Sequence, residues 1–250
     1  MSIASYPSLK DRTVLISGGG SGIGAQIVRR FAEQGSRVGF LDIATEASEA
    51  LSAELGDNVM FQQCDVTDID ALRSSITVIA DHFGPVTVLV NNAAHDERHK
   101  LEDVTPEYWD GRIAVNLKHQ FFAAQAVAPG MKEAGGGSII NMGSTSWLVG
   151  QGGMAAYTAS KSAVLGLTRS LARDLGPFNI RANSVAPGWI MTERQETLWL
   201  TPEGEKELME RQCLKRKLVP DDIARPVLFF ASDESGACTN QSYVVDGGWT

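Results

Sequence analysis

Short, β-branched apolar runs alternate with longer segments of helical periodicity along the whole chain. The runs predict strands at 13–17, 37–42, 59–64, 86–90, 138–143, 180–186 and 243–246. The longer segments predict helices at about 22–34, 45–55, 68–82, 106–133, 156–175, 202–216 and 220–231. Several runs are apolar at almost every position, which is typical of parallel strands covered on both faces. The alternation therefore predicts an α/β fold: a doubly wound, mostly parallel seven-stranded sheet with helices on both faces.

Length and composition favour one folded domain. The chain has 250 residues, of which 43% are hydrophobic, and we expect residues 1–250 to form a single domain. The net charge of −8 disfavours a nucleic-acid partner, which needs clustered lysine and arginine. The three cysteines have no CxxC spacing, which indicates a reducing compartment. We see no secretion signal and no run near the ~18 apolar residues of a membrane span, so we expect a soluble, cytoplasmic protein without a membrane partner.

The first strand runs into a glycine-rich turn, "SGGGSGIGAQIVRRF", that opens a helix. Gly18, Gly22 and Gly24 allow positive φ and let the backbone approach a pyrophosphate closely. The free N–H groups and the dipole of the helix N-terminus attract phosphate. A glycine motif alone is weak evidence, but its place between the first strand and the first helix favours a dinucleotide site.

The second strand ends at Asp42, twenty residues after Gly22. A carboxylate at this place can accept hydrogen bonds from the adenosine ribose and repels a 2′-phosphate. The glycine turn also holds no Lys or Arg to pair with such a phosphate, so we predict NAD rather than NADP. Alternatively, Asp42 only caps the helix that begins near residue 45, and the two roles are compatible.

Two later strands also end in polar side chains, at Asp65-Val66 and at "NNAA", residues 91–94. The carboxyl ends of strands are where open α/β sheets bind ligands. Asp65 can bond an adenine amino group, and Asn91 can fix the loop beside the cofactor. Taken alone, each is more ordinary as a turn residue.

The segment "GSTSWLVGQGGMAAYTASKSAV" carries the most specific chemistry. Tyr157 and Lys161 are four residues apart and therefore lie on one face of a helix. The Lys161 cation can lower the pKa of the phenol toward the working pH, so that Tyr157 removes a proton from an alcohol as hydride leaves. Ser144, which follows a strand, can hydrogen-bond the same substrate oxygen.

These motifs together resemble the classical short-chain dehydrogenase/reductase family over essentially the whole chain. The matching pieces are "SGGGSGIG", Asp42, "CDV", "NNAA", Asn116 in "VNL", the Ser-Tyr-Lys set, "NSVAPGWIMT" and "VVDGG". The resemblance implies a Rossmann fold, a homotetramer, and a catalytic tetrad in which Asn116 holds a water in a proton relay to Lys161. Two positions depart from the family pattern: Ser17 replaces Thr before the glycines, and Ala94 replaces Gly after "NNA".

The resemblance also implies which residues contact the cofactor. Lys161 should bond the nicotinamide ribose, and the backbone of Ile190 should meet the carboxamide. The full expected set is Gly18, Ser21, Gly22, Ile23, Gly24, Asp42, Ile43, Asp65, Val66, Asn92, Ala93, Tyr157, Lys161, Pro187, Gly188, Ile190 and Thr192.

The substrate should lie between residues 94–99, residues 145–153 and a lid at about 189–216. These segments are polar and rich in tryptophan, which suits a polyhydroxylated ring better than a steroid or an acyl chain. Trp199 belongs to the same lid. The expected substrate contacts are His95, Asp96, Arg98, Ser144, Trp147, Gln151, Tyr157, Trp189 and Arg194.

Stretches outside the family motifs are similar to the NAD-dependent D-xylose 1-dehydrogenase group of bacterial aldose dehydrogenases: "YPSLK", "DERHKLEDVT", "TPEGE" and "QCLK". This resemblance implies oxidation of an aldopyranose at its C1 hydroxyl to a lactone. An alternative is oxidation of a secondary alcohol in a sugar acid such as a 2-keto-3-deoxy aldonate, with Arg98 or Arg194 holding the carboxylate. Each arginine could instead pair with a neighbouring acid. A third hypothesis, a cofactor-sensing regulator, is disfavoured by the intact catalytic set.

Two features remain open from sequence. "HDERH" at 95–99 superficially resembles a metal motif, but it is not HExxH and has no helical setting, so we expect no metal. Of His95, Asp96, Arg98 and His99, the sequence does not separate those that contact substrate from those that hold the loop. The terminal Trp249-Thr250 either reaches a neighbouring subunit or is a free tail.

Overall fold

The computed structural model describes residues 4–250 and contains one seven-stranded sheet in which every pair is parallel. The strand order is β3-β2-β1-β4-β5-β6-β7. The predicted doubly wound α/β fold is therefore confirmed. The strands are β1 Thr13–Ser17, β2 Arg37–Asp42, β3 Val59–Gln63, β4 Val88–Asn91, β5 Gly137–Met142, β6 Ile180–Pro187 and β7 Ser242–Val245.

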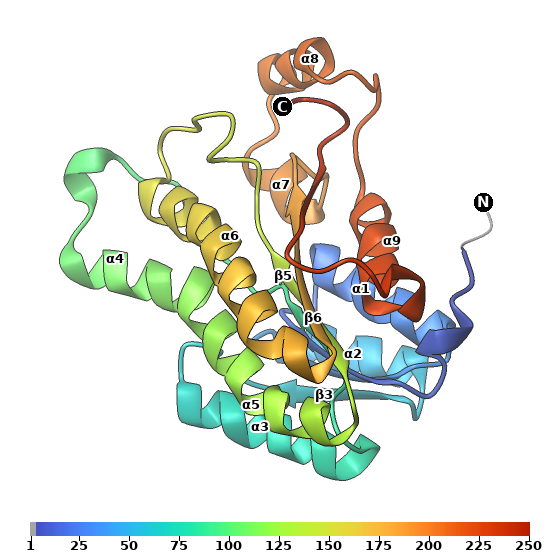
Figure 1. Cartoon of the computed structure of the whole chain (residues 1–250). Helices are drawn as coiled ribbons and strands as arrows, with labels where there is room; N and C mark the ends of the chain where they lie inside the picture. The colour runs from blue at the N-terminus through green and yellow to red at the C-terminus, as the bar shows by residue number, and fades with distance from the viewer. Residues whose placement is uncertain (1–3) are drawn as a thin grey trace.

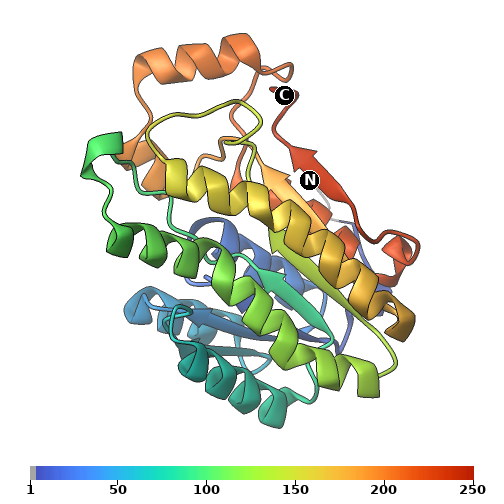
Figure 2. The ribbon, with the colours of Figure 1, turned by 60° about the vertical axis from the view of Figure 1, so that its left-hand side comes forward.

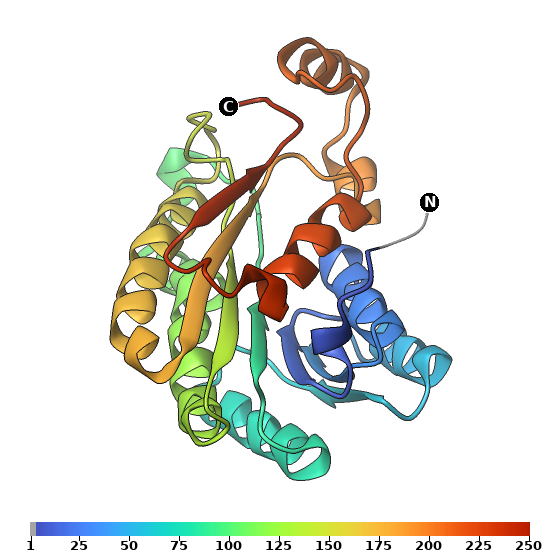
Figure 3. The same cartoon turned by 45° about the vertical axis from the view of Figure 1, so that its right-hand side comes forward.

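Helices cover both faces of this sheet (Figures 1 and 3). One apolar core lies under α1 and α9, and the other lies under α3, α5 and α6, which run side by side in Figure 2. All five residues of β1 are buried, because this central strand is covered from both sides. The helices are α1 Gly22–Glu33, α2 Thr45–Leu55, α3 Ile69–Phe83, α4 Pro106–Ile113, α5 His119–Glu133, α6 Ala155–Leu175, α7 Glu193–Leu198, α8 Pro202–Arg211 and α9 Pro220–Ala231.

The helix predicted at 106–133 is interrupted. Its first part, α4, begins with Thr105 as N-cap and Pro106 in the first turn, as expected. A π-helical segment, Ala114–Lys118, then separates α4 from α5. Each π turn adds a residue to the helical turn, and such segments are frequent at functional sites. Hydrophobic periodicity does not reveal this wider turn.

The region after β6 differs most from the expected helices. A short helix, α7, was not predicted; Thr192 caps it by accepting a hydrogen bond from the Gln195 N–H at 3.3 Å. The helix predicted at 202–216 ends at Arg211, so the predicted C-terminal end was wrong by five residues. Gln212 turns the chain into an extended path, which returns to pair Leu218 with Ile190.

The order of the strands fixes where a ligand can bind. The chain builds β1, β2 and β3 outward in one direction, then returns to place β4 on the other side of β1. The connections leaving β1 and β4 therefore diverge and leave a crevice at the carboxyl ends of these strands. α7 and α8 lie over the same end of the sheet (Figure 1). In residues 4–250 no helix is long and apolar enough to cross a membrane.

Candidate active site

A cavity of about 1770 Å³ opens at the carboxyl ends of the strands. All residues expected to contact the cofactor line it, from the glycine turn to Thr192. Most residues expected to contact substrate line it too, namely His95, Asp96, Arg98, Ser144, Gln151, Tyr157, Trp189 and Arg194. The fold thus brings both sets together in one continuous space.

The glycine turn forms a cradle that only glycine fits. Gly18 and Gly22 have φ values of 67° and 54°, in the region that side chains rarely adopt. A Cβ on Gly18 would lie 2.7 Å from Ala93 Cα, and a Cβ on Gly24 would overlap the Gly18 carbonyl. Ser21 makes no side-chain hydrogen bond to the first turn of α1, so the N–H groups of that turn remain free. This cradle fits a pyrophosphate at a helix N-terminus.

Asp42 both shapes the turn and faces the cavity. Its Oδ2 accepts a hydrogen bond from the Gly20 N–H at 2.8 Å, and its Oδ1 accepts one from the Ala44 N–H at 2.9 Å. Each carboxylate oxygen can accept a further hydrogen bond from a ribose hydroxyl. The residue that follows, Ile43, is 70% exposed and carries no charge.

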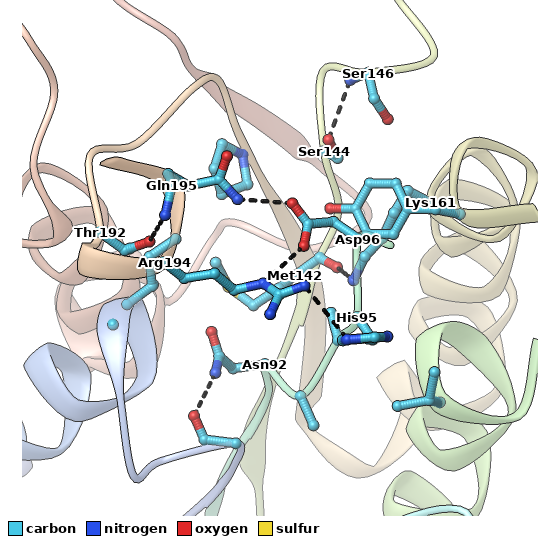
Figure 4. A pocket seen from close by; sticks show the side chains of 18 of the residues that line it. Asn92, His95, Asp96, Met142, Ser144, Ser146, Lys161, Thr192, Arg194 and Gln195 are labelled. Atoms are coloured by element: carbon cyan, nitrogen blue, oxygen red, sulfur yellow. Dashed lines mark hydrogen bonds and ion pairs between the residues drawn. The ribbon is translucent and has the colours of Figure 1, made fainter. Parts of the chain in front are cut away.

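The two asparagines at the end of β4, Asn91 and Asn92, divide their roles differently from our expectation. We expected Asn91 to fix the loop beside the cofactor, but its side chain is buried and donates to Asn141 Oδ1 at 2.9 Å and to the Gln120 carbonyl. Asn92 holds the glycine turn instead, by donating to the carbonyls of Ser17 and Gly18 at 3.1 and 2.8 Å (Figure 4). Successive side chains of a strand point to opposite faces of the sheet, so two adjacent asparagines point in opposite directions.

Ser17 provides a side-chain hydroxyl directly before the glycines, as the threonine of the family pattern does. Its Oγ accepts hydrogen bonds from the N–H groups of Asn92 and Ala93, each at 3.1 Å. These bonds tie the end of β1 to the loop after β4, across the crevice. The replacement of threonine by serine therefore leaves this connection intact.

Tyr157, Lys161 and Ser144 meet at the inner end of the cavity. Lys161 Nζ lies 5.7 Å from the centre of the Tyr157 ring and donates to the Met142 carbonyl at 2.8 Å. Burial raises the pKa of Tyr157 to about 12, although its hydrogen bond with Ser144 acts in the opposite direction. Burial lowers the pKa of Lys161 to about 7. Burial, and not the charge of Lys161, therefore sets the direction of the pKa shift of this phenol, contrary to the expectation from the sequence.

A fully buried histidine, His119, lies within the electrostatic range of Lys161. Burial, and then the charge of Lys161, lower the pKa of His119 to about 3, so its ring is neutral at pH 7. Its contacts with the backbone of Ala114 and Val115 act on this pKa in the opposite direction. Sequence reasoning missed this residue, because a lone histidine on a helix carries no distinguishing pattern.

Asn116 lies behind the cavity rather than on its wall. It is fully buried in the π-helical segment. Its Oδ1 accepts from the His95 N–H at 2.9 Å, and its Nδ2 donates to the His95 carbonyl at 3.2 Å and to the Arg112 carbonyl at 2.9 Å. In this structure the carboxamide therefore fixes the backbone of the loop at 94–99.

A charged network lies around Asp96 and Arg194 on the cavity wall (Figure 4). Asp96 accepts from Arg194 Nε at 3.2 Å and from Gln195 Nε2 at 2.7 Å, so α7 is joined to the loop at 94–99. On the other side, Arg112 bonds His95 Nδ1 and reaches the Glu97 carboxylate at 3.1 Å. Burial, followed by the two arginines, lowers the pKa of His95, which keeps the ring neutral.

The loop residues now separate into two groups. Asp96, His95 and Arg98 line the cavity, and the Arg98 guanidinium stacks 4.8 Å from the centre of the Trp199 ring. His99 does not line the cavity: its N–H donates to the Gly153 carbonyl at 2.8 Å, so it holds the loop. In the described part of the chain, no group of three or more His, Cys, Asp or Glu could hold a metal ion.

One expected substrate contact is absent and several unexpected residues are present. Trp147 does not line the cavity, although Ser146 and Val149 of the same turn do. Arg112 lines it from α4, a helix that we had assigned no part of the site. The remaining unexpected lining residues include Thr67, Lys118, Met154, Glu207, Arg211 and the C-terminal Trp249. Motifs close in sequence could not indicate them, since folding brings them in from distant segments.

Comparisons with known proteins agree with this geometry. A family model described as "Enoyl-(Acyl carrier protein) reductase" matches residues 18–250. The chain is 51% identical to the D-xylose 1-dehydrogenase of Caulobacter vibrioides over 252 residues, which cover 100% of both chains. It is also 51% identical to the protein named probable galactose dehydrogenase GalD of Rhizobium meliloti, over 97% of this chain and 96% of that one.

A crystal structure of a Sinorhizobium meliloti 1021 protein assigned to the short-chain alcohol dehydrogenases superposes with a TM-score of 0.92. It is 31% identical in sequence, and the match covers 97% of this chain and 98% of that one. The agreement therefore extends over the whole fold.

Proposed function

The chain belongs to the short-chain dehydrogenase/reductase family, whose dehydrogenases use a nicotinamide cofactor, and on this premise we propose that it oxidises an aldopyranose at its C1 hydroxyl with NAD. One observation carries the sugar assignment. Charged, amide and tryptophan side chains line the cavity that contains Tyr157. Among them, Trp189 donates a hydrogen bond to Gln195, and Gln195 donates one to Asp96. Paired donors and acceptors beside aromatic faces suit the hydroxyls and C–H patches of a sugar ring.

The reaction removes one hydride and one proton from the sugar. The C1–H bond breaks, the C1 oxygen loses its proton to the Tyr157 phenolate, and a C=O bond forms to give the lactone. Ser144 donates a hydrogen bond to the same oxygen, which it holds against Tyr157. When bound, an oxidised nicotinamide supplies the hydride acceptor and a positive charge, which favours the phenolate over the buried phenol.

Similarity supports the same assignment. By their names, the two relatives described above act on D-xylose and galactose, and the matches cover 97% or more of this chain. We therefore expect the substrate to be a pentose or a related hexose in its ring form. An NAD-coupled assay with D-xylose, L-arabinose, L-fucose and D-galactose tests this. Absorbance at the reduced nicotinamide band should rise with at least one of them; no rise with any aldose would reject the proposal.

The sugar-acid alternative loses its main support. Arg194 pairs with Asp96, and Arg98 stacks on Trp199, so each guanidinium already has a partner within the protein. A substrate carboxylate would have to displace these contacts. A 2-keto-3-deoxy aldonate in the same assay panel should therefore give no turnover.

We predict that Asp42 makes the enzyme prefer NAD. Because the carboxylate repels a 2′-phosphate, the wild-type kcat/KM should be at least about tenfold higher with NAD than with NADP. An Asp42→Ser variant should lower kcat/KM for NAD and raise it for NADP. Asp57→Ser serves as control, since Asp57 is exposed and outside the cavity. A wild-type enzyme that prefers NADP would overturn this assignment.

A further inference from the structure

The indole of Trp249 lines the cavity although it belongs to the last two residues of the chain. Glu207 and Arg211 of α8 line the same cavity, and the C-terminus lies near α8 in Figure 1. No segment expected to bind substrate includes it. We infer that Trp249 is a specificity-determining residue, and that the C-terminal tail, residues 246–250, forms a fixed wall of the sugar pocket. This inference rests on the proposed function.

Hydrogen bonds within the tail stabilise its conformation. The carboxylate of Asp246, which is 5% exposed, accepts hydrogen bonds from the N–H groups of Gly248 and Thr250, each at 2.8 Å. It also accepts one from the Thr250 hydroxyl at 2.9 Å. A buried carboxylate with three donors costs free energy to disrupt, since the charge would lose its partners. The chain on either side of Trp249 is therefore held in place.

The segment after α8 holds the tail from the other side. The N–H groups of Cys213 and Leu214 donate to the carbonyls of Gly248 and Gly247 at 3.2 and 2.9 Å. Both glycines have positive φ, 69° at Gly247 and 80° at Gly248. A Cβ on Gly248 would lie 2.8 Å from Cys213 Cβ. The pair of glycines is thus required for this close approach, and the approach delivers the indole to the cavity.

Two indoles flank the outer part of the pocket near α8. Trp189 lies against Gly204 of α8, where a Cβ would be 3.1 Å from the indole. Its Nε1 donates to Gln195 Oε1 at 2.9 Å, and Gln195 in turn donates to Asp96 beside Tyr157. Trp249 lines the same cavity as Trp189, Asp96 and the reacting phenol of Tyr157, but it takes no part in this hydrogen-bonded row.

The chemistry of an indole suits the selection of a sugar. A flat apolar face packs against the C–H side of a pyranose, and a rigid ring rejects a substituent that collides with it. A pentose and a hexose differ by one hydroxymethyl group, the kind of difference that a tight pocket discriminates by about 10- to 200-fold. The Trp249 Nε1 is buried without an acceptor in the described chain, so no hydrogen bond within the protein uses it.

The experiment compares Trp249→Ala and Trp249→Phe with wild type on the aldose panel. Trp249→Ala should raise KM for the preferred aldose at least about tenfold and change kcat and the KM for NAD by less than threefold. The pentose-to-hexose ratio of kcat/KM should fall about tenfold, and Trp249→Phe should restore much of it. Trp109→Ala is the control, because Trp109 is a partly exposed tryptophan outside the cavity.

A second pair of variants moves the tail without changing the indole. Gly248→Ala should reproduce the rise in sugar KM, because its Cβ collides with Cys213. Gly56→Ala is the matched control. Gly56 also has a positive φ, 82°, but a new Cβ there would have no atom within 4 Å, so this variant introduces backbone strain without a collision. An unchanged KM for NAD verifies that each variant is folded.

The outcomes separate the two claims. A wild-type enzyme without aldose activity refutes the proposed function. A wild-type enzyme that oxidises aldoses, while Trp249→Ala keeps the sugar KM and the pentose-to-hexose ratio within twofold, refutes the inference about the tail alone.

Discussion

Replacing Tyr157 with phenylalanine should lower kcat about 10³-fold or more while the KM for NAD stays within about threefold. The change removes one hydroxyl from a buried ring, and the proton of the sugar hydroxyl then has no acceptor. The wall of the cavity and the glycine cradle remain, so cofactor binding should persist. Steady-state kinetics with the best aldose and a binding titration with NADH measure the two effects separately.

Tyr243→Phe is the control for that substitution. Tyr243 is 53% exposed on β7 and does not line the cavity, so the loss of its hydroxyl should change kcat by less than twofold. If Tyr157→Phe keeps more than about a tenth of wild-type kcat, Tyr157 is not the general base and the proton must go to another group.

Replacing Lys161 with methionine should separate activity from stability. We expect kcat/KM to fall about 10²- to 10³-fold, because the phenolate loses the positive charge near its ring. We also expect the protein to become more stable at pH 7, since burial holds the pKa of Lys161 down at about 7. The lost hydrogen bond to Met142 offsets part of that gain. A net gain of at least about 1 kcal/mol would raise Tm by roughly 2–4 °C.

The gain in stability should depend on pH in a defined direction. Lysine has a pKa of 10.5 when exposed and about 7 here, so between these values the unfolded chain binds more protons than the folded one. The wild type is therefore penalised fully below pH 7, and the penalty fades as the pH rises toward 10.5. Thermal unfolding at pH 7 and pH 10 should show the Lys161→Met advantage shrinking.

The exposed Lys206, which only pairs with Glu210, provides the control substitution Lys206→Met. Its Tm difference from wild type should be small at both pH values. A Lys161→Met protein that is less stable than wild type at pH 7, or whose advantage is independent of pH, would contradict the assignment of a strained, buried ammonium.

Features encoded by neighbouring residues were predictable from the sequence. The apolar runs predict the strands to within two residues at either end, because burial on both faces leaves few alternatives. Gly18, Gly22 and Gly24 predict the cradle because their steric role is local. Tyr157 and Lys161 predict a shared helix face by their spacing alone, and the structure places both on the cavity wall.

Features that depend on contacts between distant segments were not predictable. Arg112 and Trp249 reach the cavity only because α4 and the C-terminal tail fold over it, and neither carries a local motif. α7 has six residues, too few for a periodic pattern, and depends on the Thr192 cap. We expected Asn91 to fix the loop beside the cofactor, but its neighbour Asn92 holds the glycine turn. Composition does not determine which of two adjacent side chains faces that turn. The homotetramer and the cytoplasmic location stay predictions.

The most direct test of the account is to follow the hydrogen at C1. D-xylose, or the best aldose of the panel, is deuterated at C1 and oxidised with NAD, and the products are analysed by mass spectrometry and NMR. The account predicts that the deuterium appears on the reduced nicotinamide, that the sugar product is an unlabelled lactone, and that kcat/KM falls by a primary isotope effect. Deuterium retained in the sugar product would mean that another carbon is oxidised and would contradict the proposed reaction.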